Sequence, residues 1–338
     1  MTLSFLTVER KTMPFLPLSR RAAFCAALAM LTCASVGAQP DSYPSKPITI
    51  VVAYPPGGST DLNGRTLGAE LSRKLGVPVI IDNVGGAGGA IGAQKVANAA
   101  PDGYTLLVGA SNEIAITRLV SSAVKYDVKD FTPIGLIATQ PMVLVASQKS
   151  GVKTVDQFMS LVRQNPGKYS FGSSGVGTAL HLAGEMVKDQ GGLFMTHIPY
   201  RGVAPLANDL LGNNIDFGVF VLSSGLPHIR SGKVVALGTT EARRSPMTAD
   251  IPALAETPRL KGIDINIWFA LMGPARLPEP VVAKLKKALN DSLQTAELRK
   301  KLEDSGSTVS PLNVDMPRFL SQETAKYKRI VEFANIKE

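Results

Sequence analysis

Residues 48–61 have the sequence Ile48-Thr49-Ile50-Val51-Val52-Ala53-Tyr54-Pro55-Pro56-Gly57-Gly58-Ser59-Thr60-Asp61. The first six residues form an apolar run, which is typical of a strand buried on both faces. The rest is a loop of small residues that opens a helix. The same arrangement recurs where Tyr169–Gly172 is followed by Ser173–Thr178. Because such loops present backbone N–H groups at a helix N-terminus, both predict a place for an anion.

Strands and helices alternate around these two loops. In the first part, strands are predicted over residues 48–53, 78–81 and 104–108, with a helix that Gly76 ends and a second helix to about residue 99. In the second part, strands are predicted over 141–147, 169–172, 197–200 and 216–220, and helices over 154–164, 179–188 and 204–211. The part from Pro280 on is mostly charged amphipathic helix. This alternation predicts an α/β fold with parallel sheets, whose ligand crevice lies at the carboxyl ends of the strands.

The composition is that of a globular protein with a substantial core. The chain has 338 residues, of which 45% are hydrophobic and 19% charged, so one large or two ordinary domains are expected. The formal net charge is +9, but the basic residues are scattered, which argues against nucleic acid as a partner. A mild positive field would instead favour the approach of anions.

The N-terminal segment has the pattern of an export signal. Arg20 and Arg21 precede the apolar run Ala22–Val36, which is short for a membrane span, and Val36-Gly37-Ala38 supplies the small residues of a cleavage site. We therefore predict a signal peptide over residues 1–38, cleaved near Ala38, and a periplasmic protein. The alternatives are an N-terminal anchor, a start at Met13 and twin-arginine export.

Removal of this segment changes the charge and the cysteine content. It takes away four basic residues and one acidic residue, so the charge falls from +9 to +6. Cys25 and Cys33, the two cysteines of the sequence, both lie in it. The mature chain is therefore expected to have no disulfide and no cysteine metal site.

Two interpretations of the loop at Gly57–Asp61 remain open. It either holds a carboxylate through backbone N–H groups, or it is an ordinary strand-to-helix turn with Asp61 as the N-cap. An anion beside Asp61 would be repelled. The Asp61 oxygens are therefore expected to bind N–H groups of the helix, or a hydroxyl or ammonium group of a ligand.

Motifs of several enzyme classes fail on spacing. The run Gly85–Gly89 would need its third glycine at Ile91 to match G-x-G-x-x-G, and the run from Gly172 would need a glycine at Val176 to match G-x-S-x-G. The three histidines are scattered, so neither a metal nor a cofactor is predicted: His181, His197 and His228.

Some side chains keep both a functional and a structural interpretation. A secreted hydrolase that uses Ser174 or Ser173 with His181 is the alternative function, whereas His181 also fits simple helix packing. Thr178 is predicted as an N-cap whose hydroxyl also faces the crevice. Arg201 is either a clamp for a carboxylate or a solvated surface residue. Trp268 is expected in the core.

Several segments, in this order along the chain, resemble the Bug family, the periplasmic solute-binding receptors of tripartite tricarboxylate transporters. They are Tyr43–Ile48, Pro56–Asp61, Asn83–Gly92, Pro101–Thr105, Ser173–His181 with Glu185, Ile198–Gly202, Pro227–Ile229 with Ser231–Lys233, and Trp268–Pro274. The departures are Tyr54, where phenylalanine is frequent, and Arg201, where lysine is frequent. The resemblance covers essentially the whole mature chain.

The resemblance implies a two-domain periplasmic-binding-protein fold of type II. Each domain would be a mostly parallel sheet flanked by helices, with two crossing strands as a hinge and the ligand cleft between the domains. Residues 39–140 with 240–338 would form domain 1, and residues 141–239 would form domain 2. Ligand carboxylates would be held largely by main-chain groups and ordered waters.

The function implied is that of a non-enzymatic receptor, which captures a small organic carboxylate by domain closure and delivers it to permease subunits. A sensor without a dedicated permease is a variant. The ligand would be a di- or tricarboxylate, an aromatic carboxylate or an acidic amino acid, and the apolar run Val219–Leu222 favours one with an apolar portion. The predicted binding residues are Tyr54, Pro56, Gly57, Gly58, Ser59, Asp61, Gly86, Ala87, Ser111, Ser173, Ser174, Gly175, Gly177, Thr178, Tyr200, Arg201, Gly202, Asp216 and Phe220.

Overall fold

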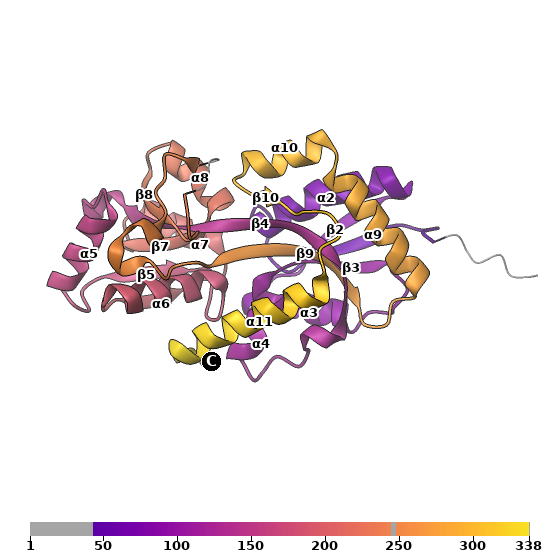
Figure 1. Ribbon diagram of the computed structural model, residues 1–338, viewed down its shortest axis with the longest axis horizontal. Helices are drawn as coiled ribbons and strands as arrows, with labels where there is room; N and C mark the ends of the chain where they lie inside the picture. The colour runs from indigo at the N-terminus through magenta and orange to yellow at the C-terminus, as the bar shows by residue number, and fades with distance from the viewer. Residues whose placement is uncertain (1–42, 245–247, 338) are drawn as a thin grey trace, which may run out of the picture. The chain divides into compact units, whose positions relative to one another are not determined.

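The computed structural model describes residues 43–244 and 248–337 (Figure 1). The predicted signal peptide over residues 1–38 lies outside the described residues. All helices and strands below belong to the unit that begins at Pro44. In the described part of the chain, no helix is both long enough and apolar enough to cross a membrane.

The elements alternate as the sequence predicts. The strands are β1 (Ile48–Val52), β2 (Val79–Asn83), β3 (Thr105–Ala110), β4 (Phe131–Ser147), β5 (Ser170–Ser173), β6 (Thr196–Pro199), β7 (Phe217–Val221), β8 (Val234–Thr239), β9 (Asn266–Pro274) and β10 (Thr308–Val309). The α-helices are α2 (Ser59–Leu75), α3 (Ala90–Ala97), α4 (Thr117–Val120), α5 (Val155–Gln164), α6 (Ala179–Gly191), α7 (Val203–Leu211), α8 (Leu222–Arg230), α9 (Glu279–Leu293), α10 (Ala296–Asp304) and α11 (Met316–Phe333).

The strands form one mixed sheet in the order β2-β1-β3-β9-β4-β7-β5-β6, with β10 and β8 also paired to β4. The strands β1, β2 and β3 are parallel, as are β5, β6 and β7, which confirms the predicted parallel pairing. The antiparallel strands β9 and β4 join the two groups. Because β4 pairs with β9 as far as Pro141 and with β7 from Met142 on, it belongs to two half-sheets. We call the group with β1 the first half-sheet and the group with β5 the second half-sheet.

The strand predicted from Pro141 is much longer than expected. β4 begins at Phe131, and its pairing with β9 shifts register between Pro133 and Gly135 and again between Leu136 and Ala138. Proline lacks the N–H that a ladder needs, and glycine weakens a strand. Because these residues interrupt the pattern typical of a strand, the sequence does not predict the first half of β4.

The chain passes between the half-sheets twice, at neighbouring positions. One passage is β4 at Met142, which runs beside β9 in Figure 1. The other is at Ile265, just before β9; its N–H donates to the Thr240 carbonyl, and the Thr240 N–H donates to the Met142 carbonyl. This pair of crossings matches the two-strand connection that the resemblance implies.

Local signals in the sequence explain several elements. Leu67 and Leu71 bury one face of α2, and Gly76 ends the helix in the left-handed conformation with φ of 72°. Thr154 caps α5 by accepting a hydrogen bond from the Gln157 N–H. Trp268 is buried, as predicted, and its indole N–H donates to Glu323 at 3.0 Å.

Candidate functional site

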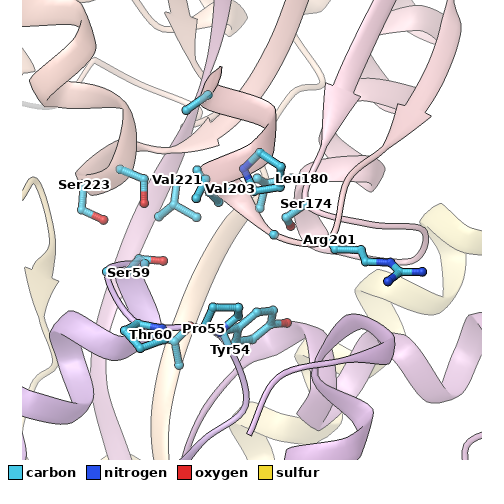
Figure 2. Close-up of a pocket in the computed structure, with 18 of the residues that line it drawn as sticks. Tyr54, Pro55, Ser59, Thr60, Ser174, Leu180, Arg201, Val203, Val221 and Ser223 are labelled. Atoms are coloured by element: carbon cyan, nitrogen blue, oxygen red, sulfur yellow. The ribbon is translucent and has the colours of Figure 1, made fainter. Parts of the chain in front are cut away.

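A cavity of about 400 Å³ lies between the two half-sheets (Figure 2). Apart from Ile267 of β9, its lining comes from the carboxyl ends of β1, β3, β5, β6 and β7 and the segments that follow them. Parallel strands present these ends at one edge, which is where α/β proteins bind ligands. The cavity therefore lies where the order of strands and helices predicts it.

The loop after β1 ends in an open helix start. Gly58 is the N-cap of α2 and provides no side-chain cap, so the first N–H groups of the helix have no partner within it. Gly57, just before it, has φ of 89°, a conformation that favours glycine. Ser59 and Thr60, the first two residues of α2, line the cavity. This arrangement has the charge and the free donors that suit an anion.

Asp61 does not face the cavity and is not the N-cap. Its carboxylate accepts hydrogen bonds from the Gly57 N–H at 2.9 Å, Arg65 Nε at 3.0 Å and Asn83 Nδ2 at 2.9 Å. Burial alone would raise the pKa of Asp61, but the hydrogen bonds from Arg65, Gly57 and Asn83 outweigh it and lower the pKa. Asp61 thus holds the loop in place. The prediction that Asp61 is the N-cap of the helix is wrong, because Gly58 occupies that position.

Tyr54 joins a buried hydrogen-bond network behind the loop. Its hydroxyl lies 2.9 Å from the Gly88 carbonyl and 3.1 Å from Glu113 Oε2, both acceptors, and accepts from Asn112 Nδ2 at 2.8 Å. Burial is the largest cause that raises the pKa of Tyr54, and the neighbouring Glu113 adds to it. Glu113 is also fully buried, which raises its pKa to about 7 although the Ala110 N–H donates to it.

Asn112 connects the two sides of the cavity. It lines the cavity from the segment after β3, and its Oδ1 accepts a hydrogen bond of 2.7 Å from the N–H of Ala179, the first residue of α6. Its Nδ2 donates to Tyr54 at the same time. One amide side chain thus links the loop after β1 to the helix after β5.

The second loop, Ser173–Thr178, uses its donors internally. The Gly175 N–H donates to Ser173 Oγ, the Gly177 N–H to His181 Nδ1 and the Thr178 N–H to the Gly175 carbonyl. Thr178 is the N-cap of α6, as predicted, and its hydroxyl accepts from the His181 N–H and donates to Gly175. The expectation of bare N–H groups in this loop is therefore wrong at these positions, and the Thr178 hydroxyl does not face the cavity.

The histidines that are scattered in sequence meet in space. The rings of His181 and His197 stack with centroids 3.7 Å apart, and Ser173 Oγ lies 2.7 Å from His197 Nε2. Burial lowers the pKa of His197 to about 3, and His181 adds to the shift. Ser173 is fully buried, and His181 accepts from Gly177 rather than from Ser174. Among the described residues, no group of three His, Cys, Asp or Glu side chains is placed to hold a metal ion.

Two further open helix starts lie at the cavity. α7 begins after Gly202, and α8 begins after Val221, and neither N-cap has a side-chain hydrogen bond. Val203 and Ser223, in their first turns, line the cavity. Ser224 Oγ is buried there and, among the described residues, has no hydrogen-bond partner. Three helix N-termini therefore converge on one cavity.

The structure brings fewer than half of the predicted binding residues to the cavity wall. Those that line it are Tyr54, Pro56, Gly57, Gly58, Ser59, Ser174, Arg201 and Gly202. Those that do not line it are Asp61, Gly86, Ala87, Ser111, Ser173, Gly175, Gly177, Thr178, Tyr200, Asp216 and Phe220. Among these, Ser111 is fully buried after β3, Ala87 lies in the loop beside Gly88, and the Tyr200 hydroxyl donates to Asp209 at 2.7 Å.

Two of these residues lie away from the cavity for a reason of strand geometry. Asp216 precedes β7, at the end of the strand away from the cavity, where its carboxylate accepts from the Ser170 N–H. Phe220 packs in the core with Val143 and Leu206, since alternate residues of a strand point to opposite faces. Val221, one residue later, lines the cavity instead.

Other lining residues escaped prediction. They include Thr60, Asn112, Leu180, Val203, Val221, Ser223, Ser224, His228 and Ile267. Asn112, Val203 and Ser223 follow the carboxyl ends of β3, β6 and β7. The rule that places ligands at this edge, applied to every strand, would have found them.

The family model described as "Tripartite tricarboxylate transporter family receptor" matches residues 64–336. The chain belongs to this family of receptors. Its relative BugT of Bordetella pertussis is 32% identical over 294 residues, which cover 86% of this chain and 90% of BugT. The resemblance to the Bug family is thereby confirmed.

Solved structures of relatives have the same fold. Rpa4515 of R. palustris, determined with adipate, is 31% identical to this chain with a TM-score of 0.84. The match covers 87% of this chain and 99% of the Rpa4515 chain. MatC of Rhodopseudomonas palustris, with bound malate, is 30% identical to this chain with a TM-score of 0.80. The match covers 86% of this chain and 100% of the MatC chain. The receptor has the periplasmic-binding-protein fold predicted from the sequence.

Proposed function

We propose that this chain is a periplasmic receptor that captures a small organic carboxylate in the cavity and delivers it to the permease subunits of a tripartite tricarboxylate transporter. The observation that carries the proposal is the convergence of α2, α7 and α8, three helices without side-chain caps, on one cavity. Each helix start offers free N–H groups and about half a positive charge. The carboxylates bound to Rpa4515 and MatC support this ligand class.

We also propose the two domains that the resemblance implies, residues 39–140 with 240–338 and residues 141–239. The change of partner along β4, from β9 at Pro141 to β7 at Met142, supports the boundary after residue 140. The packing of Ile251 with Val143 and Leu206, by contrast, favours a second boundary near Ile265. Closure of the domains would exclude water and strengthen the hydrogen bonds to the ligand. The contact of Asn112 with Ala179 would hold the closed form.

The proposed role excludes catalysis. The hydrolase alternative needs a base for Ser174, and His181, its candidate, accepts from the Gly177 N–H and stacks on His197. A Ser174→Ala variant that stays folded and loses esterase turnover would restore the hydrolase alternative. The sensor variant shares the same binding site and differs in the protein partner alone.

Binding to the purified protein tests the proposal. After refolding to remove any carried ligand, the protein is titrated by calorimetry with malate, adipate, citrate, glutamate and aromatic acids. At 100 times its Kd, a true ligand stabilises the fold by about 2.7 kcal/mol, which a thermal shift detects. The absence of both heat and thermal shift across the whole panel would overturn the proposal.

A further inference from the structure

The wall of the cavity opposite the first loop is apolar. It is formed by Leu180 of α6, Val203 and Ala207 of α7, Val221 at the end of β7 and Ile267 of β9. Figure 2 shows Val203 and Val221 on the side of the cavity opposite Pro55, so that a ligand between them touches carbon on both sides. Such a wall suits a ligand body without polar groups.

Polar groups gather at one end of this wall. Figure 2 places Ser59, at the start of α2, across the cavity from Ser223, at the start of α8. The buried Ser224 Oγ, which has no hydrogen-bond partner among the described residues, lies in the same turn of α8. A carboxylate between these two helix starts would accept hydrogen bonds from the backbone N–H groups in the first turns of both α2 and α8.

Positive side chains contribute little inside the cavity. Among the described lining residues, Arg201 is the one arginine and there is no lysine. Arg201 is exposed, and Figure 2 shows its guanidinium group pointing away from Val203 and Val221. The charge that would balance a buried anion therefore comes mainly from the three helix starts, at about half a unit each, which together can balance one carboxylate but not the three of a citrate-like ligand.

We infer that the ligand is an organic acid with one carboxylate and an apolar aromatic or branched aliphatic body, rather than a citrate-like tricarboxylate. This rests on the proposed function and narrows its ligand class. The carboxylate lies between the starts of α2 and α8, and the body lies between Pro55 and the wall of Val203 and Val221. A tricarboxylate would bury two further charges against carbon, which is costly without partners.

Calorimetry with phenylacetate, 4-methylpentanoate, citrate and phenylacetamide tests the ligand class. Phenylacetate or 4-methylpentanoate should bind at least tenfold more tightly than citrate, and phenylacetamide, which lacks the charge, at least tenfold more weakly than phenylacetate. Tighter binding of citrate would overturn the inference and leave the proposed function intact. Failure of these acids together with every carboxylate of the wider panel would overturn both.

A matched pair of variants tests the place of the ligand body. Val221→Ala removes two methyl groups from this wall without adding a helix cap, and should weaken phenylacetate binding roughly tenfold. Val219→Ala makes the same change two residues earlier on β7, at a buried residue outside the cavity lining, and should leave the affinity unchanged. Equal affinities for the two variants, both measured at a temperature where both are folded, would overturn the inference.

Discussion

The two strand–loop–helix units of similar sequence have helix starts of opposite character. After β1, α2 begins at Gly58 without a side-chain cap, and its first residues line the cavity. After β5, α6 begins with Thr178 as a cap, and Asn112 accepts the Ala179 N–H as well. A glycine-rich loop before a helix therefore does not by itself make an anion site, because what matters is whether the chain has already used the donors.

The largest expected effect on ligand binding comes from adding a charged side-chain cap at the uncapped start of α2. Gly58 is extended with φ of −84°, and an added Cβ would have no heavy atom within 4 Å, so other residues fit. Gly58→Asp supplies a carboxylate cap. At about 4 Å, it would repel a bound carboxylate by about 4 kcal/mol, which is roughly a thousandfold loss of affinity in calorimetry.

The uncharged control is Gly58→Asn, which has nearly the same size and also caps the helix. It should weaken binding far less than Gly58→Asp, with thermal stability retained in both. Equal losses for the two variants would mean that no anion lies at the start of α2.

The two units should also differ in how pH changes their stability. Burial raises the pKa of Glu113, beside Tyr54, to about 7 from 4.5. Between these values the folded protein binds more protons than the unfolded chain, so the free energy of unfolding falls as pH rises. The loss reaches about 3 kcal/mol above pH 7, and Glu113→Gln should remove it in urea denaturation at pH 5 and pH 8.

The second unit has the opposite slope. The pKa of His197, lowered to about 3 from 6.5, means that the unfolded chain binds the proton first as pH falls. Stability from this residue is therefore present above pH 6.5 and decreases as pH falls below it. For the first unit, a Glu113→Gln variant that still loses stability between pH 5 and pH 8 as the wild type does would contradict the assignment of that loss to Glu113.

The link between the units should have a moderate effect on binding. Asn112→Ala removes the hydrogen bonds to Ala179 and Tyr54, and should weaken ligand binding roughly tenfold, mainly through faster dissociation. Asn98→Ala, which removes a hydrogen bond at the end of α3, is the control. Stopped-flow dissociation rates that are the same for both variants would exclude Asn112 as a link that holds the closed form.

The smallest effect on ligand binding is expected at the start of α6, which Thr178 caps. Thr178→Val removes the cap of α6 and should lower the free energy of unfolding by about 1 kcal/mol in urea denaturation. The ligand Kd should change less than twofold, because the start of α6 is already used by the chain itself. A variant with normal stability and lost binding would reverse the roles of the two loops.

The sequence predicted the fold well where the signals are local. Leu67 and Leu71 before Gly76, and Thr154 before α5, act within a few residues of where they stand. Alternation of elements likewise placed the loops after β1 and β5 at the cavity. The strand β4 was cut short at Pro141 because a shift of register at Pro133 and Gly135 follows from pairing with β9, far away in sequence.

The site was predicted less well because its decisive contacts are not local. The partner of the Ala179 N–H is Asn112, 67 residues earlier, so no pattern near α6 indicates that its start is closed. Asp61 is held partly by Asn83 from β2. The choice between Phe220 and Val221 depends on which face of β7 meets the cavity, which the apolar run Val219–Leu222 cannot specify.

Amide chemical shifts during a ligand titration test the central claim most directly. In ¹H–¹⁵N spectra, binding of a carboxylate should move the amide protons of Ser59 and Thr60 downfield as they form charge-assisted hydrogen bonds. The amide of His181 should stay nearly unchanged, because the Thr178 hydroxyl in the same loop remains its partner. A large shift at His181 with none at Ser59 and Thr60 would contradict the account.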